Sequence, residues 1–451
     1  MRTINVHEVA DQARFNGFHA VVLFWCTLTI IFDGYDLAVA GIALPSIMKE
    51  MGVDATSAGF MVSSALFGMM LGAIVLGTIA DRIGRRSAIA ICVALFSVFT
   101  ACAGLTTDPV TFSIFRFLAG LGIGGLMPNV VAHMTEYSPK RTRNMLVTLM
   151  FSGYAVGGML AAVLGKGLIE SYGWQSVFLA AGIPVMIIPM VLKWLPESMP
   201  FLIKAGRTKE LQHIIARMNP AYRMAPGDSF TLPADDKVTG APIQQLFRDG
   251  RGKSTILFWV VFFMCLFMVY ALSSWLTKLM AGAGYSLGSA LTFVLVLNFG
   301  AVGGGWLADR FNIKYVLMSF FAVAAVSITL LGFGVPTALL YVLVATAGAT
   351  TIGTQLLAYA YVGQFYPMAV RSTGIGWASG VGRNGAILAP IVIGTLVAMN
   401  LSLQHNFIAI AIPAIVALVA LSLIDHRRSA TTPRHDELPS AATMASQATG
   451  S

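Results

Sequence analysis

Twelve long apolar segments recur along this chain and limit the folds open to it. A helix needs about 20 apolar residues to cross the ~30 Å hydrocarbon core of a bilayer, and each segment has roughly that length. Charged residues make up 11% of the chain, far below the roughly 25% typical of soluble domains. The sequence therefore predicts an all-α polytopic membrane protein with twelve transmembrane helices. The predicted spans lie near residues 20–42, 57–80, 87–106, 110–133, 145–168, 175–195, 254–280, 286–308, 313–334, 336–361, 371–397 and 403–424.

The distribution of basic residues predicts the orientation of these spans. Most of the 29 Lys and Arg residues precede the first span, follow the last, or fall in even-to-odd connections, whereas Lys49, Lys166 and Lys278 lie at the opposite ends. By the positive-inside rule both termini are cytoplasmic, and we expect the bacterial inner (plasma) membrane. Residues 1–19 mix acidic and basic side chains and show no cleavable signal peptide. The net charge of +9 is explained by topology and by lipid headgroups, so membrane lipids are expected partners and nucleic acid is not.

An internal repeat divides the chain. The decapeptide Gly77–Arg86 (GTIADRIGRR) aligns with Gly305–Lys314 (GWLADRFNIK), and the same offset pairs Pro139 with Pro367. Such a repeat indicates two similar six-helix bundles with a substrate site between them near the bilayer midplane. The expected parts are a cytoplasmic N-terminal segment (1–19), an N-terminal bundle (20–195), a cytoplasmic central loop (196–253), a C-terminal bundle (254–425) and a disordered cytoplasmic tail (426–451).

The central loop contains a short amphipathic pattern. Leu211, Ile214, Ile215 and Met218 recur at helical spacing. We expect a helix here that lies on the cytoplasmic face of the membrane.

Two carboxylates, Asp33 and Asp36, lie inside the first apolar segment. An aspartate at bilayer depth costs roughly 2.5–3.5 kcal/mol, and a spacing of three residues places both on one helix face. Burial and mutual repulsion both raise a carboxyl pKa, so the pair is a candidate for loading and releasing a proton. The alternative is that one of them only hydrogen-bonds a helix break at Gly34.

Two arginines also lie within spans and need partners there. For Arg116, in span four, the most economical partner is the aspartate pair of span one; direct contact with substrate is the alternative. Arg383, in span eleven, has no acidic residue in the spans of the C-terminal half to neutralise it. Because a guanidinium fits a carboxylate through two parallel hydrogen bonds, an anionic substrate is its expected partner, with an ion pair to Asp33 or Asp36 as the alternative. Asn384 is a candidate for an additional polar contact.

The motifs as a whole resemble one large transporter family. Twelve spans in two halves, the long central loop, Gly77-x-x-x-Asp81-Arg82-x-Gly84-Arg85-Arg86 and its degenerate copy near Asp309 are similar to the major facilitator superfamily. Within it, FDGYDLAVAGIALP in span one, RFLAGLGIGGLMPN in span four and GVGRNGAILAP in span eleven resemble the aromatic acid:proton symporters.

The resemblance implies roles for residues at the cytoplasmic edge. In the superfamily the first motif is a conformational latch, which assigns gating to Gly77, Asp81, Arg82, Gly84, Arg85 and Arg86. Asp309 and Arg310 form its second copy, which we expect to be weaker because Asn312 and Ile313 replace the corresponding Gly and Arg. The resemblance also suggests gating for Glu136, for which an exposed ion pair is the alternative.

The function implied by the resemblance is proton-coupled import of an aromatic carboxylate, such as benzoate or a hydroxybenzoate, by alternating access. Tyr35, Tyr154, Tyr359 and Trp377 are candidates to wall the aromatic ring, although most membrane aromatics simply pack. A proton-coupled porter of an aliphatic acid or a sugar is the alternative, and a transporter-like sensor is a more distant one. We expect no enzymatic activity, no cofactor and no metal, and a chain that functions as a monomer with substrate and protons as its partners.

Overall fold

The computed structural model describes residues 3–222, 229–231, 244, 246–248, 250–303, 312–366 and 368–426. The expected spans are present as helices, and those of the first half are α2 (Gly17–Met51), α3 (Ala55–Ile83), α4 (Arg85–Ala103), α5 (Pro109–Tyr137), α6 (Arg143–Tyr172), α7 (Gln175–Ala180) and α8 (Ile188–Trp194). Those of the second half are α12 (Gly252–Gly282), α13 (Leu287–Gly303), α14 (Ile313–Leu331), α15 (Thr337–Phe365), α16 (Met368–Ala398) and α17 (Leu403–Ser422). Within the described residues, 11 segments are long and apolar enough to cross a membrane, and α13 contributes a shorter apolar helix.

Local sequence signals explain where several spans begin and break. The carboxylates of Asp54 and Asp108 cap the first turns of α3 and α5 by accepting backbone N–H bonds. Hydrogen bonds from the side chains of Ser57 and Thr111 lower the pKa values of these two capping carboxylates. The sixth span is not one continuous helix: a 3-10 turn at Ile183–Ile187, which contains Pro184, separates α7 from α8.

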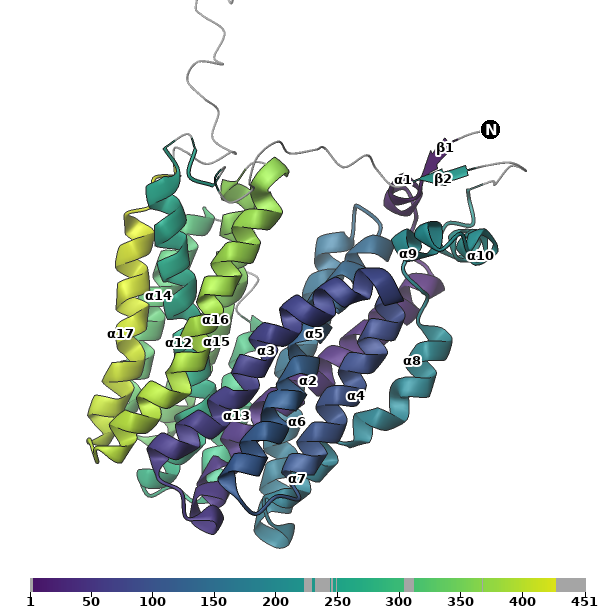
Figure 1. The fold of residues 1–451 in the computed structure, drawn as a ribbon. Helices are drawn as coiled ribbons and strands as arrows, with labels where there is room; N and C mark the ends of the chain where they lie inside the picture. The colour runs from purple at the N-terminus through teal and green to yellow at the C-terminus, as the bar shows by residue number, and fades with distance from the viewer. Residues whose placement is uncertain are drawn as a thin grey trace, which may run out of the picture.

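The two sets of spans form two bundles that lie side by side, α2–α8 in purple to teal and α12–α17 in green to yellow (Figure 1). Helix α2 packs on α12, α3 on α16, and α6 on α13. We call the membrane side that carries residues 3–16 and 195–222 the loop side, and the opposite side, where α2 ends and α3 begins, the far side.

The bundles touch on the far side and separate toward the loop side. One stripe of α16 shows this. Gly394 packs against the Ala55 carbonyl, the Pro390 carbonyl packs against Gly59, and the Ile387 carbonyl accepts a 2.6 Å hydrogen bond from Ser63. Farther along the same stripe, Cβ atoms added at Gly380 and Gly376 would meet nothing within 4 Å. The structure is therefore open toward the loop side.

The segments outside the membrane form a cap on the first bundle at the loop side. Strand β1 (Thr3–Asn5) pairs in parallel with β2 (Ser229–Thr231), and α1 (Val6–Asp11) packs on α10 (Thr208–Met218), which follows α9 (Met199–Lys204). Asn219 donates to the Val9 carbonyl at 3.1 Å.

The amphipathic helix of the central loop is present as α10, on the loop side of the first bundle. Its apolar side chains are at most 5% exposed, because α1, α2 and α9 cover them. Most of the loop after Tyr222, the degenerate motif with Asp309 and Arg310, and the tail from residue 427 lie outside the described residues.

Candidate functional site

A buried ion pair lies inside the first bundle. Arg116 of α5 donates to the Asp36 carboxylate of α2 at 2.5 Å and to the Thr100 hydroxyl of α4 at 2.8 Å. Thr100 in turn donates to the second carboxylate oxygen of Asp36 at 2.5 Å. Arg116 and Asp36 are each 1% exposed. The expected pairing of Arg116 with one of the two aspartates is present, and Thr100 is a third member that the sequence did not reveal.

Asp33, one turn before Asp36, is in a different state. It is fully buried, and neither of its carboxylate oxygens has a hydrogen-bond partner among the described residues. The charges that act on it are those of Asp36 and, from the other bundle, Arg383. An unpaired carboxylate in such a place is unstable when ionised. The structure therefore distinguishes the two acids: Asp36 is paired with Arg116, and Asp33 has no hydrogen-bond partner in the part of the chain that the structure describes.

Arg383 lies on α16 at the point where the two bundles separate. Its guanidinium donates to the Met69 sulfur of α3 at 3.2 Å, and it forms no ion pair with any carboxylate in the described part of the chain. A thioether is a weak acceptor. The cation therefore keeps most of its hydrogen-bonding capacity for another partner.

A small cavity with a mostly apolar lining and a few polar side chains lies between the bundles, next to Gly34 of α2. Tyr154 and Gly158 of α6 and Arg116 of α5 face it from the first bundle, and Tyr270 of α12 and Asn298 of α13 face it from the second. Asp33 and Arg383 lie close enough to both tyrosines to interact with them electrostatically. Tyr270 thus joins Tyr154 at the centre of the molecule.

Two other aromatic candidates, Tyr359 and Tyr35, differ in how near they lie to this cavity. Tyr359 hydrogen-bonds Ser379 at 2.8 Å and lies close enough to Tyr270 to affect it electrostatically. Tyr35 points away: its hydroxyl donates to the Val177 carbonyl of α7 at 2.8 Å, within the first bundle. The expectation that Tyr35 walls the site was therefore wrong.

Asn384 and Trp377 were also misplaced by the sequence reasoning. They share an exposed stripe of α16 with Leu388 and Val392, which are 43% and 40% exposed. Asn384 donates back to carbonyls of its own helix, and Trp377 stacks on Trp259 at 5.7 Å. One residue along a helix turns the side chain by about 100°, so Asn384 leaves the site although its neighbour Arg383 faces it.

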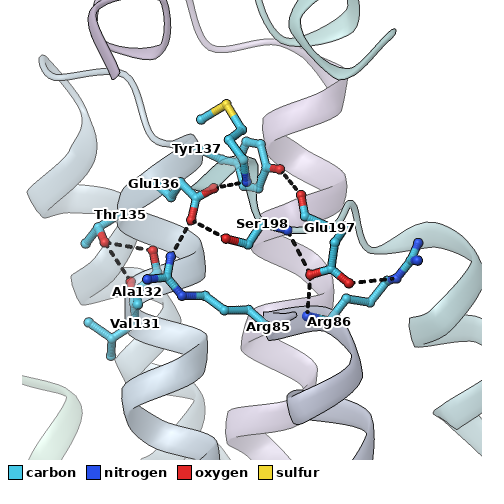
Figure 2. A network of polar contacts seen from close by, with 10 residues as sticks. Arg85, Arg86, Val131, Ala132, Thr135, Glu136, Tyr137, Glu197 and Ser198 are labelled. Atoms are coloured by element: carbon cyan, nitrogen blue, oxygen red, sulfur yellow. Dashed lines mark hydrogen bonds and ion pairs between the residues drawn. The ribbon is translucent and has the colours of Figure 1, made fainter. Parts of the chain in front are cut away.

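Figure 2 shows a second polar network, at the loop side of the first bundle. Arg85 pairs with Glu136, which also accepts bonds from Ser198 and the Met199 backbone. Arg86 pairs with Glu197 at 3.6 Å. The network ties the start of α4, the end of α5 and the start of α9 together, and Glu136 is 3% exposed rather than a surface ion pair.

The side chain of Glu197 explains why position 84 is a glycine. Its carboxylate accepts the Arg86 backbone N–H at 3.1 Å and so caps α4 from another segment. Gly84 has φ +91°, and a Cβ there would meet that carboxylate at 2.6 Å. Glu197 and Ser198 were not among the residues that the sequence analysis singled out.

The remaining candidates for gating among the described residues are Gly77, Asp81 and Arg82 of α3. Arg82 is exposed at the end of α3, and Asp81 lies in the same helical turn. A Cβ added at Gly77 would meet nothing within 4 Å in this open state. Among the described residues, no group of three or more His, Cys, Asp or Glu side chains could hold a metal ion.

Comparisons with known proteins agree with this architecture. The family model described as Major Facilitator Superfamily matches residues 26–390 and 299–447. The benzoate transport protein of Acinetobacter baylyi is 46% identical over 95% of this chain and 94% of its own length. The 4-hydroxybenzoate transporter of the same organism is 34% identical, over 94% of this chain and 95% of its own.

Among solved structures, the xylose transporter XylE from E. coli in a partially occluded inward open conformation is similar, with a TM-score of 0.69 and 17% identity. The match covers 89% of this chain and 98% of that one. This likeness concerns the fold, whereas the family model and the curated relatives extend to the sequence. The chain belongs to the major facilitator superfamily, in the group that includes the curated aromatic acid transporters.

Proposed function

We propose that this protein is a proton-coupled symporter that imports an aromatic carboxylate, such as benzoate or a hydroxybenzoate, by alternating access. The observation that carries the proposal is the arrangement at the junction of the bundles. A bare buried carboxylate, Asp33, belongs to one bundle, and a guanidinium without a carboxylate partner among the described residues, Arg383, belongs to the other. The names of the relatives support the substrate class.

The charges suggest an order of events. In this proposal Arg383 binds the substrate carboxylate through two parallel hydrogen bonds, as guanidinium groups do. A substrate anion beside Asp33 disfavours the ionised form of that aspartate, so Asp33 takes up a proton when the substrate binds. Tyr154 and Tyr270, which line the cavity, supply aromatic walls for the ring, and Tyr359, near Tyr270, supplies a third. In this proposal Asp36 stays paired with Arg116 and does not take part in coupling.

Alternating access requires the open loop side to close. We propose that this side is cytoplasmic, that the protein lies in the plasma membrane, and that it works as a monomer. The network of Arg85, Arg86, Glu136 and Glu197 then keeps the loop end of the first bundle rigid. Gly77 offers a smooth surface against which the second bundle can close, and Asp81, Arg82, Asp309 and Arg310 complete the proposed gating set.

Uptake into proteoliposomes tests the function. Purified protein is reconstituted, the outside is made acidic, and radiolabelled benzoate, 4-hydroxybenzoate, protocatechuate, gentisate and 3-phenylpropionate are compared with succinate and xylose. Protein-free liposomes are the essential control, because undissociated benzoic acid crosses bilayers unaided and collects on the alkaline side.

We expect protein-dependent accumulation of at least one aromatic acid that a protonophore abolishes. Accumulation of succinate or xylose with no aromatic acid transported would replace this proposal by the alternative porter. Binding of an aromatic acid without any flux would favour a sensor.

A further inference from the structure

A hydrogen-bond acceptor without a donor lines the cavity between the bundles. Asn298 of α13 is 8% exposed and belongs to the cavity lining. Its side-chain NH2 group donates to the Val294 carbonyl of its own helix at 2.9 Å. A carbonyl can only accept, so this bond fixes which end of the amide is the NH2 group. The other end, Oδ1, accepts no hydrogen bond from any residue that the structure describes.

This oxygen is turned across the boundary between the bundles. A Cβ added at Gly158 of α6 would lie 2.4 Å from Oδ1 of Asn298, nearer than to any other atom. Gly158 lines the same cavity, and its missing side chain leaves room for the amide. Oδ1 is therefore the part of Asn298 that faces the first bundle, where the two bundles enclose the cavity.

Asn298 lies toward the far-side end of the cavity. Its contact Gly158 follows Tyr154 by one helical turn, and α6 runs from the loop side to the far side. Ser274, which also lines the cavity, follows Tyr270 of α12 by one turn in the same direction. The end of the cavity beyond the two tyrosines thus carries neutral polar groups of the second bundle.

The opposite end of the cavity is bordered by Arg383. Its guanidinium contacts Met69 of α3. Ala65 and Leu66, which line the cavity, lie about one turn from Met69 toward the far side. The cavity therefore extends from the cation of Arg383 in the direction of Asn298.

The other polar groups of the lining are less selective than Asn298. Arg116 is engaged within the first bundle by Asp36 and Thr100. Serine and tyrosine hydroxyls can donate as well as accept, so they do not distinguish a donor from an acceptor on a ligand. An amide oxygen can only accept, and it requires an O–H or N–H group opposite it.

The two ends of the cavity therefore match different chemical groups. The guanidinium of Arg383 fits a carboxylate, and Oδ1 of Asn298 fits a hydrogen-bond donor. Between them the lining is mostly apolar, with Leu37, Leu66 and Val269 among its side chains. A rigid ring that carries a carboxylate at one end and a hydroxyl at the other presents its groups in this order.

We propose that Asn298 is a specificity-determining residue whose Oδ1 accepts a hydrogen bond from a ring hydroxyl opposite the carboxylate that Arg383 binds. The inference rests on the proposed function and narrows its substrate to an aromatic acid with a hydroxyl at position 4. Unsubstituted benzoate leaves Oδ1 without a donor inside the cavity, and a buried acceptor without a partner weakens binding.

Equilibrium binding to the purified protein in detergent tests this without any flux. Binding of radiolabelled 4-hydroxybenzoate and of radiolabelled benzoate is measured directly at one fixed pH, and 4-methoxybenzoate and 2-hydroxybenzoate are added as competitors. The methoxy group has no proton to donate, and the hydroxyl of the 2-isomer lies beside the carboxylate. We expect 4-hydroxybenzoate to bind about two- to tenfold more tightly than each of the others, the effect of one ordinary hydrogen bond.

Asn298→Leu keeps the approximate size of the side chain and removes the acceptor. It should weaken binding of 4-hydroxybenzoate to the level of benzoate and leave the affinity for benzoate unchanged. Asn129→Leu is the matched control. Asn129 is 3% exposed, its amide likewise donates to the carbonyl four residues earlier, Gly125, at 2.8 Å, and it is not among the residues that line the cavity. This control should retain the preference for the hydroxyl.

Equal affinities of the unaltered protein for 4-hydroxybenzoate and benzoate would overturn the proposal and leave the proposed function in place. This ranking needs no variant, so it decides the matter even where Asn298→Leu does not fold. A preference that survives in Asn298→Leu would also overturn the proposal, because another group would then recognise the hydroxyl. If 4-hydroxybenzoate binds with the expected preference but no aromatic acid is accumulated in proteoliposomes, the proposed transport fails and the role of Asn298 in recognition stands.

Discussion

The two bundles differ in how they handle charge at the depth of the cavity. The first bundle places Asp33, Asp36 and Arg116 there and pairs two of them with each other. The second bundle places Arg383 there, without a carboxylate of its own among the described residues to neutralise it. Among the described residues, Asp33 of the first bundle and Arg383 of the second therefore have no partner of opposite charge.

This difference indicates which charged groups can take part in transport and which serve only the stability of a bundle. A pair sealed within one bundle keeps its geometry when the bundles move, so it serves stability. Charges left over on opposite bundles change their separation during the movement and can respond to a ligand or a proton between them. The predictions below test this division between structural and working charges, beginning with the largest expected effect.

Asp33→Asn should abolish accumulation of substrate against a gradient, because an amide cannot load and release the coupled proton. Exchange of labelled for unlabelled substrate across the membrane should persist, since binding at Arg383 remains. Both are measured in proteoliposomes with an imposed pH difference. Asp36→Asn is the comparison, and its main effect should be on stability. If both variants still concentrate substrate, coupling lies elsewhere.

Arg116→Met should destabilise the protein by about 3–5 kcal/mol, the usual cost of leaving one partner of a buried ion pair alone. Combining it with Asp36→Leu should restore much of that stability, because no buried charge is then left unpaired. Thermal unfolding in detergent measures both. A double variant less stable than either single variant would show that the pair is not a sealed structural unit.

Arg383→Lys keeps the charge and loses the planar fork. We expect the apparent affinity for the aromatic acid to weaken about ten- to a hundredfold, consistent with roughly 1.5–3 kcal/mol for a hydrogen bond to a charged group. Concentration-dependent uptake provides the measurement. Transport with unchanged apparent affinity would remove Arg383 from the binding site.

Gly84→Ala should cost about 1–3 kcal/mol, since the new Cβ combines positive-φ strain with a clash against Glu197. Gly206→Ala is the matched control, because Gly206 also has positive φ (+67°) but open space around it. The difference between the two unfolding midpoints isolates the contact with Glu197. Equal losses would mean that the carboxylate moves aside without cost.

The smallest expected effect is none at all. A monocarboxylate carried with one proton transfers no net charge, so a valinomycin-set potential at equal pH should drive no accumulation. A second proton would add one charge, worth about 2.3 kcal/mol per 100 mV. Because Asp36 is tied to Arg116, the proposed mechanism assigns the single proton to Asp33. Voltage-driven accumulation would show that a second group joins it.

Much of the fold was predictable from local sequence. The helices lie where the apolar segments lie, because a helix satisfies the backbone hydrogen bonds of such a segment within the segment itself. The pairing of Arg116 with an aspartate followed from the cost of a lone charge in a span. Thr100 was not predictable, because a threonine in an apolar helix ordinarily bonds its own backbone.

The errors have a common origin. Asn384, Trp377 and Tyr35 were placed in the site from their position along a span, but the direction of a side chain depends on rotation about the helix axis and on which neighbours cover each face. The cover of the apolar face of α10 was likewise not readable from the sequence. A hydrophobic stripe requires burial and does not state against what, and here α1 and α9 supply the cover.

The sequence by itself determined the number and positions of the spans, the division into two bundles and the presence of a few charges that need partners. These follow from hydropathy and from the cost of burying charge, both of which act through composition and short-range order. The tertiary structure alone decided that Asp36 is neutralised within its bundle and that Glu197 reaches Gly84. It also decided that, among the residues it describes, Asp33 and Arg383 have no such partner. Those outcomes depend on distances between segments far apart in the chain, which are set by how helices pack.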